Sequence, residues 1–331
     1  MEILPGVHQI KIDYKGRPLQ LYLLRFGGEN LLMDCGDASS PAHDVLPYFQ
    51  KIGMKPEELT HVLITHPDTD HCGGIHAIKA ACPNARFYCG TDDRTQIETP
   101  EGFAHGRSML HTYWHGMGLT EDKVPGLVER IGGAGAKVTM TQTFGGGETF
   151  RLGGKELHIL HLPGHSMGHL GVYLPWENAA IIGDAVHHRG NYYLDGRTAF
   201  AVTYIWVDAY LGTIDHLEAM KLDKLLSCHW SNWMDNGAVT SWLRESREYA
   251  LKAEGVIFDA IKAAGDAGIT LKDLCVKAKP GLGNWDVQYD GYSANMLSGH
   301  IQRLRDRGWV RADASNRPVR YFHEKQWHGI M

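Results

Sequence analysis

Short apolar runs alternate with segments of helical composition over the first two thirds of the chain. The runs at residues 19–24 and 30–33 flank a glycine pair, which predicts a β-hairpin. Residues 74–81 have the composition of a helix that ends before a proline, and residues 86–89 form the next expected strand. Because this order returns after residue 135, we expect an α/β fold in which two sheets pack face to face with helices outside.

The hydrophobic pattern changes after residue 236. Residues 241–251 run without a helix breaker toward the apolar segment 256–261, which predicts one long helix or two abutting helices. Two further helices are expected, one starting at residue 269 and one over residues 293–307. Two short apolar runs separated by a polar, proline-containing turn then predict a C-terminal hairpin.

Three helices followed by a hairpin resemble a winged helix. We therefore expect two domains, a larger α/β domain at residues 1–250 and a winged-helix-like domain at residues 251–331. Because a long helix joins the two domains, the sequence does not place this boundary at a definite residue.

Several apolar runs end directly at histidine or aspartate. The densest group follows the run 62–64, where two histidines and two aspartates occupy six positions. Three later runs, at residues 157–162, 179–182 and 224–228, also lead into histidine or aspartate. Strand ends that converge on one edge of a sheet bring such side chains together, and imidazole and carboxylate groups bind divalent ions such as zinc. A polar surface loop is the alternative for the first segment alone. The three later segments favour a metal site.

These segments resemble the metallo-β-lactamase-fold superfamily of metal-dependent hydrolases. The family's motifs occur in the family's order over roughly residues 1 to 235, namely Asp34-Cys35-Gly36, the loop 65–74, the segment 163–169, Gly183-Asp184 and a late His229. The resemblance implies an αββα sandwich, the same architecture that the hydrophobic pattern predicts.

The resemblance also implies two metal ions and their ligands. The first ion would bind His66, Asp68 and His165, the second would bind Asp70, His71 and His229, and Asp184 would bridge them. Asp68 is a departure, because the family usually has a second histidine at this position.

The extra carboxylate changes the charge of the cluster. Two divalent ions with Asp68, Asp70, Asp184 and a bridging hydroxide are neutral, whereas the all-histidine pattern keeps one positive charge. A neutral cluster is a weaker Lewis acid, and a carboxylate moves the metal preference toward iron or manganese. We expect zinc, with iron or manganese as alternatives.

The function implied is that of a metallo-hydrolase. A metal lowers the pKa of bound water to about 7, so that a metal-bound hydroxide can cleave a small-molecule ester, lactone, thioester or amide. Asp70 and Asp184 would be the catalytic residues, and Asp70 could relay a proton. A metal-dependent nuclease and a di-iron oxidoreductase stay open as alternatives. The oxidoreductase pattern has a carboxylate at the position of Asp68 but usually includes a flavodoxin-like domain, and no flavin-binding segment is visible.

Composition agrees with a globular enzyme, since the chain has 331 residues, 43% hydrophobic and 21% charged. No apolar run is long enough to span a bilayer, and the first residues lack the pattern of a secretory signal. The six cysteines contain no Cys-x-x-Cys pair, and free thiols fit a reducing compartment. Cys72 and Cys228 lie beside predicted ligands, where packing is favoured over metal binding. We expect a cytoplasmic protein that does not contact a membrane.

The expected partner is a small-molecule substrate. Six arginines give the C-terminal segment a basic character that would suit DNA or RNA, namely Arg303, Arg305, Arg307, Arg311, Arg317 and Arg320. The net charge of −5 and the acidic residues between them argue against nucleic-acid binding. Appended winged helices in this superfamily act as lids or dimer contacts, so a homodimer stays open.

Two segments are candidates for the substrate pocket, because aromatic and cationic side chains in loops near a strand-end site often line pockets. Surface packing of long loops is the alternative. Residues 92–126 carry His105, Arg107, His111, Tyr113, Trp114 and His115. Residues 187–206 carry His187, His188, Arg189, Tyr192, Tyr193, Tyr204 and Trp206.

Overall fold

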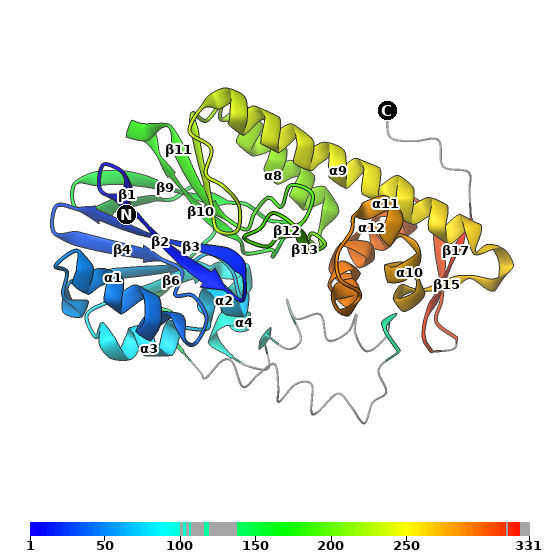
Figure 1. The fold of residues 1–331 in the computed structure, drawn as a ribbon, viewed down its shortest axis with the longest axis horizontal. Coiled ribbons are helices and arrows are strands. Elements are labelled where there is room, and N and C mark those ends of the chain that lie inside the picture. The colour runs from blue at the N-terminus through cyan, green and yellow to red at the C-terminus, as the bar shows by residue number, and fades with distance from the viewer. Residues whose placement is uncertain (100–101, 104–105, 107–115, 119–137, 316, 325–331) are drawn as a thin grey trace.

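The computed structural model describes residues 1–99, 102–103, 106, 116–118, 138–315 and 317–324, and Figure 1 shows their fold. The first sheet has the strand order β1 (Glu2–Leu4), β2 (Val7–Tyr14), β3 (Arg17–Phe26), β4 (Glu29–Met33), β5 (His61–Ile64), β6 (Arg86–Gly90) and β7 (Gln142–Phe144). The second has the order β14 (Lys224–Ser227), β11 (Ala179–Gly183), β10 (Leu170–Leu174), β9 (Lys155–His161) and β8 (Thr149–Leu152). The expected hairpin is the antiparallel pair β3 and β4.

The two sheets enclose an apolar core and are covered by helices, which confirms the predicted αββα sandwich. Side chains from both sheets, among them Leu21, Val62 and Val172, belong to one buried cluster. In the part of the chain that the structure describes, the helices beside the first sheet are α1 (Leu46–Lys51), α2 (Thr69–Cys72), α3 (Ile75–Ala81) and α4 (Arg94–Glu98). The helices α8 (Val207–Ala219) and α9 (Asn236–Ala263) pack beside the second sheet (Figure 1).

The C-terminal elements lie at the far end of α9 (Figure 1). They are α10 (Leu271–Lys277), α11 (Lys279–Leu282), α12 (Ala294–Asp306) and a small sheet with the order β15 (Ile269–Thr270), β17 (Arg320–His323) and β16 (Val310–Asp313). The predicted hairpin is β16 with β17. The helix expected from residue 269 begins at Leu271, because the Thr270 side chain caps it by accepting from the Asp273 backbone N–H.

The boundary predicted after residue 250 falls inside α9, which is one continuous helix. Apolar residues on both sides of that position, such as Tyr210 of α8 and Leu297 of α12, belong to one buried cluster. The division into two domains and the winged-helix assignment stay predictions. Among the described residues, no helix combines the length and apolar character that crossing a membrane needs.

Strand direction places the ligand loops on one edge of the sandwich. In the first sheet β4, β5 and β6 are parallel, so the loops after them open on the same side. In the second sheet β9 and β11 are both antiparallel to β10, and β11 is parallel to β14. The loops that follow β9, β11 and β14 therefore also share an edge.

Helix α12 approaches the backbone that precedes α8 closely at Gly299. A Cβ at Gly299 would overlap the carbonyl oxygen of Ile205. We expect Gly299→Ala to lower the free energy of unfolding by about 1–3 kcal/mol, because the helix must move away from this contact.

Gly212→Ala is the matched control, since Gly212 lies within α8 with nothing within 4 Å of the added carbon. It should stabilise the chain by up to about 1 kcal/mol. Urea denaturation of both variants measures the difference, and equal midpoints would contradict the close contact.

Candidate metal centre

The structure brings all of the predicted ligands together at this edge. His66, Asp68, Asp70 and His71 follow β5, while His165 follows β9, Asp184 follows β11 and His229 follows β14. The ligand atoms of His66, Asp68 and His165 lie within 4.8 Å of one another, and so do those of Asp70, His71 and His229. Asp184 forms such a group with His66 and His71, which places it between the other two.

Each group is compact and largely buried. In the first, Asp68 Oδ2 lies 3.1 Å from His165 Nε2 and 3.7 Å from His66 Nε2. In the second, His229 Nε2 lies 3.2 Å from His71 Nε2 and 3.4 Å from Asp70 Oδ2. Asp184 Oδ2 lies 3.3 Å from His229 Nε2 and 3.6 Å from His71 Nε2.

The far nitrogen of three histidines is fixed by an acceptor. His229 Nδ1 donates to the Pro18 carbonyl oxygen at 2.7 Å, and His71 Nδ1 donates to the Asp34 carboxylate at 2.9 Å. The Thr65 hydroxyl donates to Asp34, so it accepts from His66 Nδ1 at 2.9 Å. When a metal displaces the Nε2 proton, each ring presents a lone pair at Nε2 to the space that it shares with the carboxylates. Histidine ligands of metals are oriented in this way.

Among the ligand candidates in the described part of the chain, two buried atoms have no hydrogen-bond partner. They are His66 Nε2 and Asp184 Oδ1. A buried carboxylate oxygen and a buried imidazole lone pair are both costly when unpaired, and a divalent cation between them removes that cost. The imidazole and carboxylate donors present are those of zinc, iron and manganese sites. The residues therefore fit bound divalent ions.

Comparison with known proteins gives the family. The family model described as "Metallo-beta-lactamase superfamily" matches residues 16–229, which contain all of the groups above. The chain belongs to this superfamily.

The chain is similar to a hydroxyacylglutathione hydrolase of Hyphomonas neptunium. The two are 35% identical over an aligned region that covers 44% of this chain and 41% of the relative. An atrochrysone carboxyl ACP thioesterase of Aspergillus fumigatus is 26% identical over 51% of the chain and 30% of the relative. The chain thus spans less than half the length of these relatives. A metallo-beta-lactamase family protein of Thermus thermophilus shares the fold with a TM-score of 0.72 at 22% identity, covering 98% of this chain and 100% of that one.

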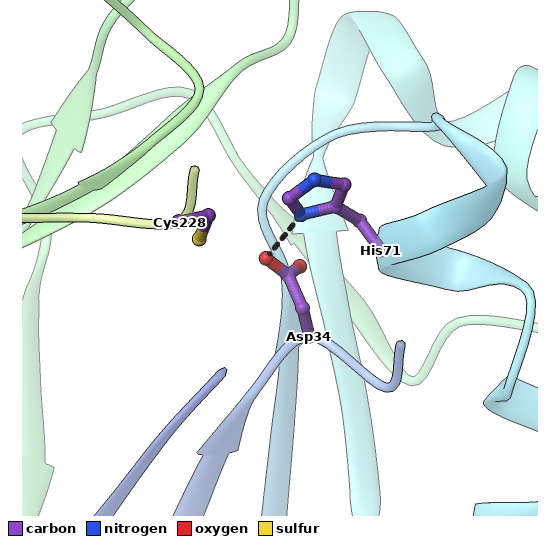
Figure 2. A group of neighbouring side chains, drawn as sticks. All are labelled: Asp34, His71 and Cys228. Atoms are coloured by element: carbon purple, nitrogen blue, oxygen red, sulfur yellow. Dashed lines mark hydrogen bonds and ion pairs between the residues drawn. The ribbon is translucent and has the colours of Figure 1, made fainter. Parts of the chain in front are cut away.

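Asp34 and Thr65 support the centre, and the sequence pattern predicted Asp34 only as part of a motif. Figure 2 shows Asp34 pointing at His71, with Cys228 beside them. The Asp34 carboxylate also accepts from the Thr65 backbone N–H at 2.7 Å and from the Thr65 hydroxyl at 2.8 Å. One carboxylate therefore orients a histidine in each ligand group, directly for His71 and through Thr65 for His66.

Cys228 forms a compact group with Asp34 and His71 beside the centre. Its side chain is buried, and burial raises the pKa of the Cys228 thiol to about 12, so that it is protonated at neutral pH. This agrees with the packing interpretation of the cysteines beside the ligands. All six cysteines are free thiols.

His187 is a second supporting residue, predicted only as a pocket candidate. Its Nε2 lies 2.7 Å from Nδ1 of the ligand candidate His165, and its backbone N–H donates to the Tyr210 hydroxyl at 3.1 Å. Its ring packs edge-on against Trp230. An orienting partner for His165 was thus available in the sequence, but no spacing signal connects positions 165 and 187.

The turn before Asp184 requires glycine. Gly183 has a φ of +53°, and a Cβ there would lie 3.1 Å from His169 Cε1 and 3.2 Å from Thr65 Oγ1. The sharp turn directs Asp184 into the centre, and the Asp184 backbone N–H donates to His169 Nε2 at 3.2 Å.

A cavity of about 1030 Å³ adjoins the second ligand group at His229. His188, Tyr192 and Tyr193 of the predicted segment 187–206 line it, together with Trp230, Trp233 and Trp242. Tyr204 is instead buried against Tyr210, and Arg189 pairs with Glu245. The six pocket candidates of the segment 92–126 lie outside the described residues.

The charges of the centre predict how metal-free protein responds to pH. Burial opposes the charged ring of His71, but Asp184 and Asp34 outweigh it and raise the pKa of His71 well above 6.5. Burial likewise opposes ionisation of Asp184, but His229 and His71 hold its pKa well below 3.8. The stabilisation from Asp184 is lost in acid, and that from His71 is complete below pH 6.5 and is lost as pH rises through its folded-state pKa.

Chelator-treated protein should therefore lose thermal stability as pH rises above 6.5, whereas the metal-loaded protein should not, because ions replace the protons. Apparent metal affinity should rise about tenfold per pH unit for each proton displaced. Melting curves and metal titrations between pH 6 and 9 measure both trends. A metal affinity that falls with pH would contradict the assignment.

Proposed function

We propose that this chain is a metal-dependent hydrolase that cleaves the acyl bond of a small-molecule ester, lactone, thioester or amide. The observation that carries the proposal is the pair of ligand groups joined by Asp184, in which histidine rings held at Nδ1 bring their Nε2 atoms together with three carboxylates. The names of two relatives, a hydroxyacylglutathione hydrolase and an acyl carrier thioesterase, favour a thioester among these substrates.

Bound divalent ions would lower the pKa of a water molecule and polarise the substrate carbonyl. His66, Asp68 and His165 would hold the first ion, Asp70, His71 and His229 the second, and Asp184 both. Asp70 keeps part of its side chain accessible, and its second oxygen could accept the proton of the attacking water. In the metal-free protein, burial opposes its charge, but the hydrogen bond from His229 lowers the pKa of Asp70, so it is ionised at neutral pH.

Zinc is the proposed metal, with iron or manganese as alternatives. Asp68 adds a third carboxylate to the cluster, which is compatible with all of these ions. A colourless preparation that retains zinc would favour hydrolysis, whereas a coloured iron protein would favour the di-iron oxidoreductase.

Three of the six C-terminal arginines have carboxylate partners, which argues against a nuclease. Arg303 binds Asp208 and Glu254, Arg307 reaches Glu254, and Arg311 binds Glu324, so their charges are compensated inside the chain. A phosphate backbone is attracted by uncompensated cations. A small molecule is therefore the proposed substrate.

The test is a hydrolysis screen on protein with quantified metal. We expect turnover of one or more thioesters or lactones, loss of that turnover on chelation, and recovery when zinc or manganese returns. Cleavage of phosphodiesters but not of acyl substrates would contradict the proposal and favour the nuclease.

A further inference from the structure

The hairpin between β2 and β3 borders the metal centre. The carbonyl oxygen of Pro18 accepts from His229 Nδ1 at 2.7 Å, so the residue after Arg17 contacts a ligand candidate directly. Tyr14 pairs with Arg17 in the hairpin register. Burial and the charge of Asp70 both raise the pKa of Tyr14, which places that ring within electrostatic range of the second ligand group.

Arg17 is held between two aromatic rings rather than by a carboxylate. Its guanidinium carbon lies 4.9 Å from the centre of the Tyr14 ring and 4.8 Å from that of Phe200. Within the described ranges it forms no ion pair, whereas Arg247 and Arg303 each bind two carboxylates. Aromatic faces orient the guanidinium and leave its N–H groups available to a ligand.

The hairpin carries a second cation and one carboxylate beside Arg17. The Lys15 ammonium lies 4.8 Å from the centre of the Tyr14 ring. The nearby carboxylate of Asp13 accepts from the Gly16 backbone N–H at 2.7 Å and so is used by the turn itself. The tip of the hairpin therefore presents two cations, Lys15 and Arg17, to an anionic ligand. The one carboxylate beside them, that of Asp13, is hydrogen-bonded to the backbone of the turn.

The C-terminal segment extends the aromatic surface next to Arg17. The short helix η7 (Val287–Ser293) contributes Tyr292, whose ring centre lies 4.8 Å from that of Phe200, and Tyr289, at 6.2 Å. The rings of Tyr14 and Phe200 thus flank the guanidinium, and Tyr289 and Tyr292 extend this aromatic surface on the side of Phe200. An aromatic or otherwise flat acyl group would pack on such a surface.

We propose that Arg17 determines specificity by binding a carboxylate or phosphate on the acyl part of the substrate, while the surrounding aromatic rings hold the apolar body of that acyl group. The inference rests on the proposed hydrolase function and names its substrate class, an anionic acyl ester or thioester. The planar guanidinium matches either anion through paired hydrogen bonds.

Three rigid thioesters of ethanethiol test the proposal. Their acyl groups are 4-carboxybenzoyl, 4-phosphonobenzoyl and the neutral 4-carbamoylbenzoyl. We expect the metal-loaded protein to prefer at least one anionic member over the neutral one by about 10- to 100-fold in kcat/KM, the range of a charge-assisted hydrogen-bond pair. The preferred anion distinguishes a carboxylate site from a phosphate site.

Substitutions assign the preference to Arg17. Arg17→Met should reduce the ratio to near one, and Arg17→Lys should restore part of it. Arg151→Met is the matched control, because Arg151 is exposed on β8 and pairs with Glu156. It should keep the full ratio. Equal rates for all three thioesters, or a preference that Arg17→Met retains, would overturn the inference while leaving a hydrolase in place.

Binding separates this inference from the proposed function. Calorimetry compares terephthalate with 4-carbamoylbenzoate, which carry the same metal-binding carboxylate but differ at the other end. Tighter binding of terephthalate that Arg17→Met removes would support the anion site even if no thioester is cleaved. Equal binding of the two compounds, together with no preference for the 4-phosphonobenzoyl thioester, would overturn the inference, while the hydrolysis screen decides the proposed function.

Discussion

Replacing Asp184 by asparagine is expected to lower kcat by at least about a thousandfold, because metal catalysis supplies several kcal/mol and this carboxylate joins the two ligand groups. Asp184 lies 3.3 Å from His229 Nε2 and 3.6 Å from His71 Nε2, and its other oxygen is buried without a partner in the described residues. Asparagine has nearly the same shape, but it removes one negative charge and turns an acceptor into a donor.

Two measurements separate loss of chemistry from loss of structure. Metal content should fall by up to one ion per chain, while circular dichroism should stay close to wild type. Asp223→Asn is the matched control, because Asp223 is an exposed carboxylate just before β14. It should leave kcat and metal content unchanged. An Asp184→Asn variant with near wild-type turnover would remove the basis of the proposed function.

Asp34→Asn is expected to have the second largest effect, although Asp34 is not a predicted ligand. We expect metal affinity to fall by about 10- to 100-fold, the usual cost of losing an orienting partner of a ligand histidine. The metal-free protein should also lose about 3 kcal/mol of stability, because a buried His71–Asp34 pair at 2.9 Å is broken. The amide nitrogen of asparagine would face either the Thr65 hydroxyl or His71 Nδ1–H, which are both donors to Asp34.

The backbone conformation at residue 34 accepts asparagine as well as aspartate, so Asp34→Asn changes only the side-chain chemistry. Asp34 has a φ of +64°, in the left-handed region that asparagine tolerates at least as well as aspartate. Backbone strain therefore does not explain a loss. Metal titration and thermal melting of Asp34→Asn beside Asp223→Asn measure the two effects. Unchanged affinity and melting temperature would show that Asp34 does not orient the centre.

The sequence determined the αββα architecture of the chain. Strand and helix periods differ, so residues 19–24, 74–81 and 86–89 carried local signals that the structure bears out in β3, α3 and β6. The candidate ligands could also be predicted, because each lies in a segment that follows an apolar strand and the motif order matches a family. The sequence did not define the domain boundary near residue 250, because a continuous amphipathic helix gives no boundary signal.

Only the tertiary structure decided how these residues are supported. Asp34 reaches His71 across 37 positions, His187 reaches His165 across 22, and Pro18 holds His229 across 211. The stacking of Arg17 between Tyr14 and Phe200 depends in the same way on segments that are distant in the chain. Local propensity and spacing encode short-range geometry, whereas hydrogen bonds between loops depend on how the two sheets pack. The sequence therefore named the chemical groups of the centre, and the packing of the sheets decided which of them orient one another.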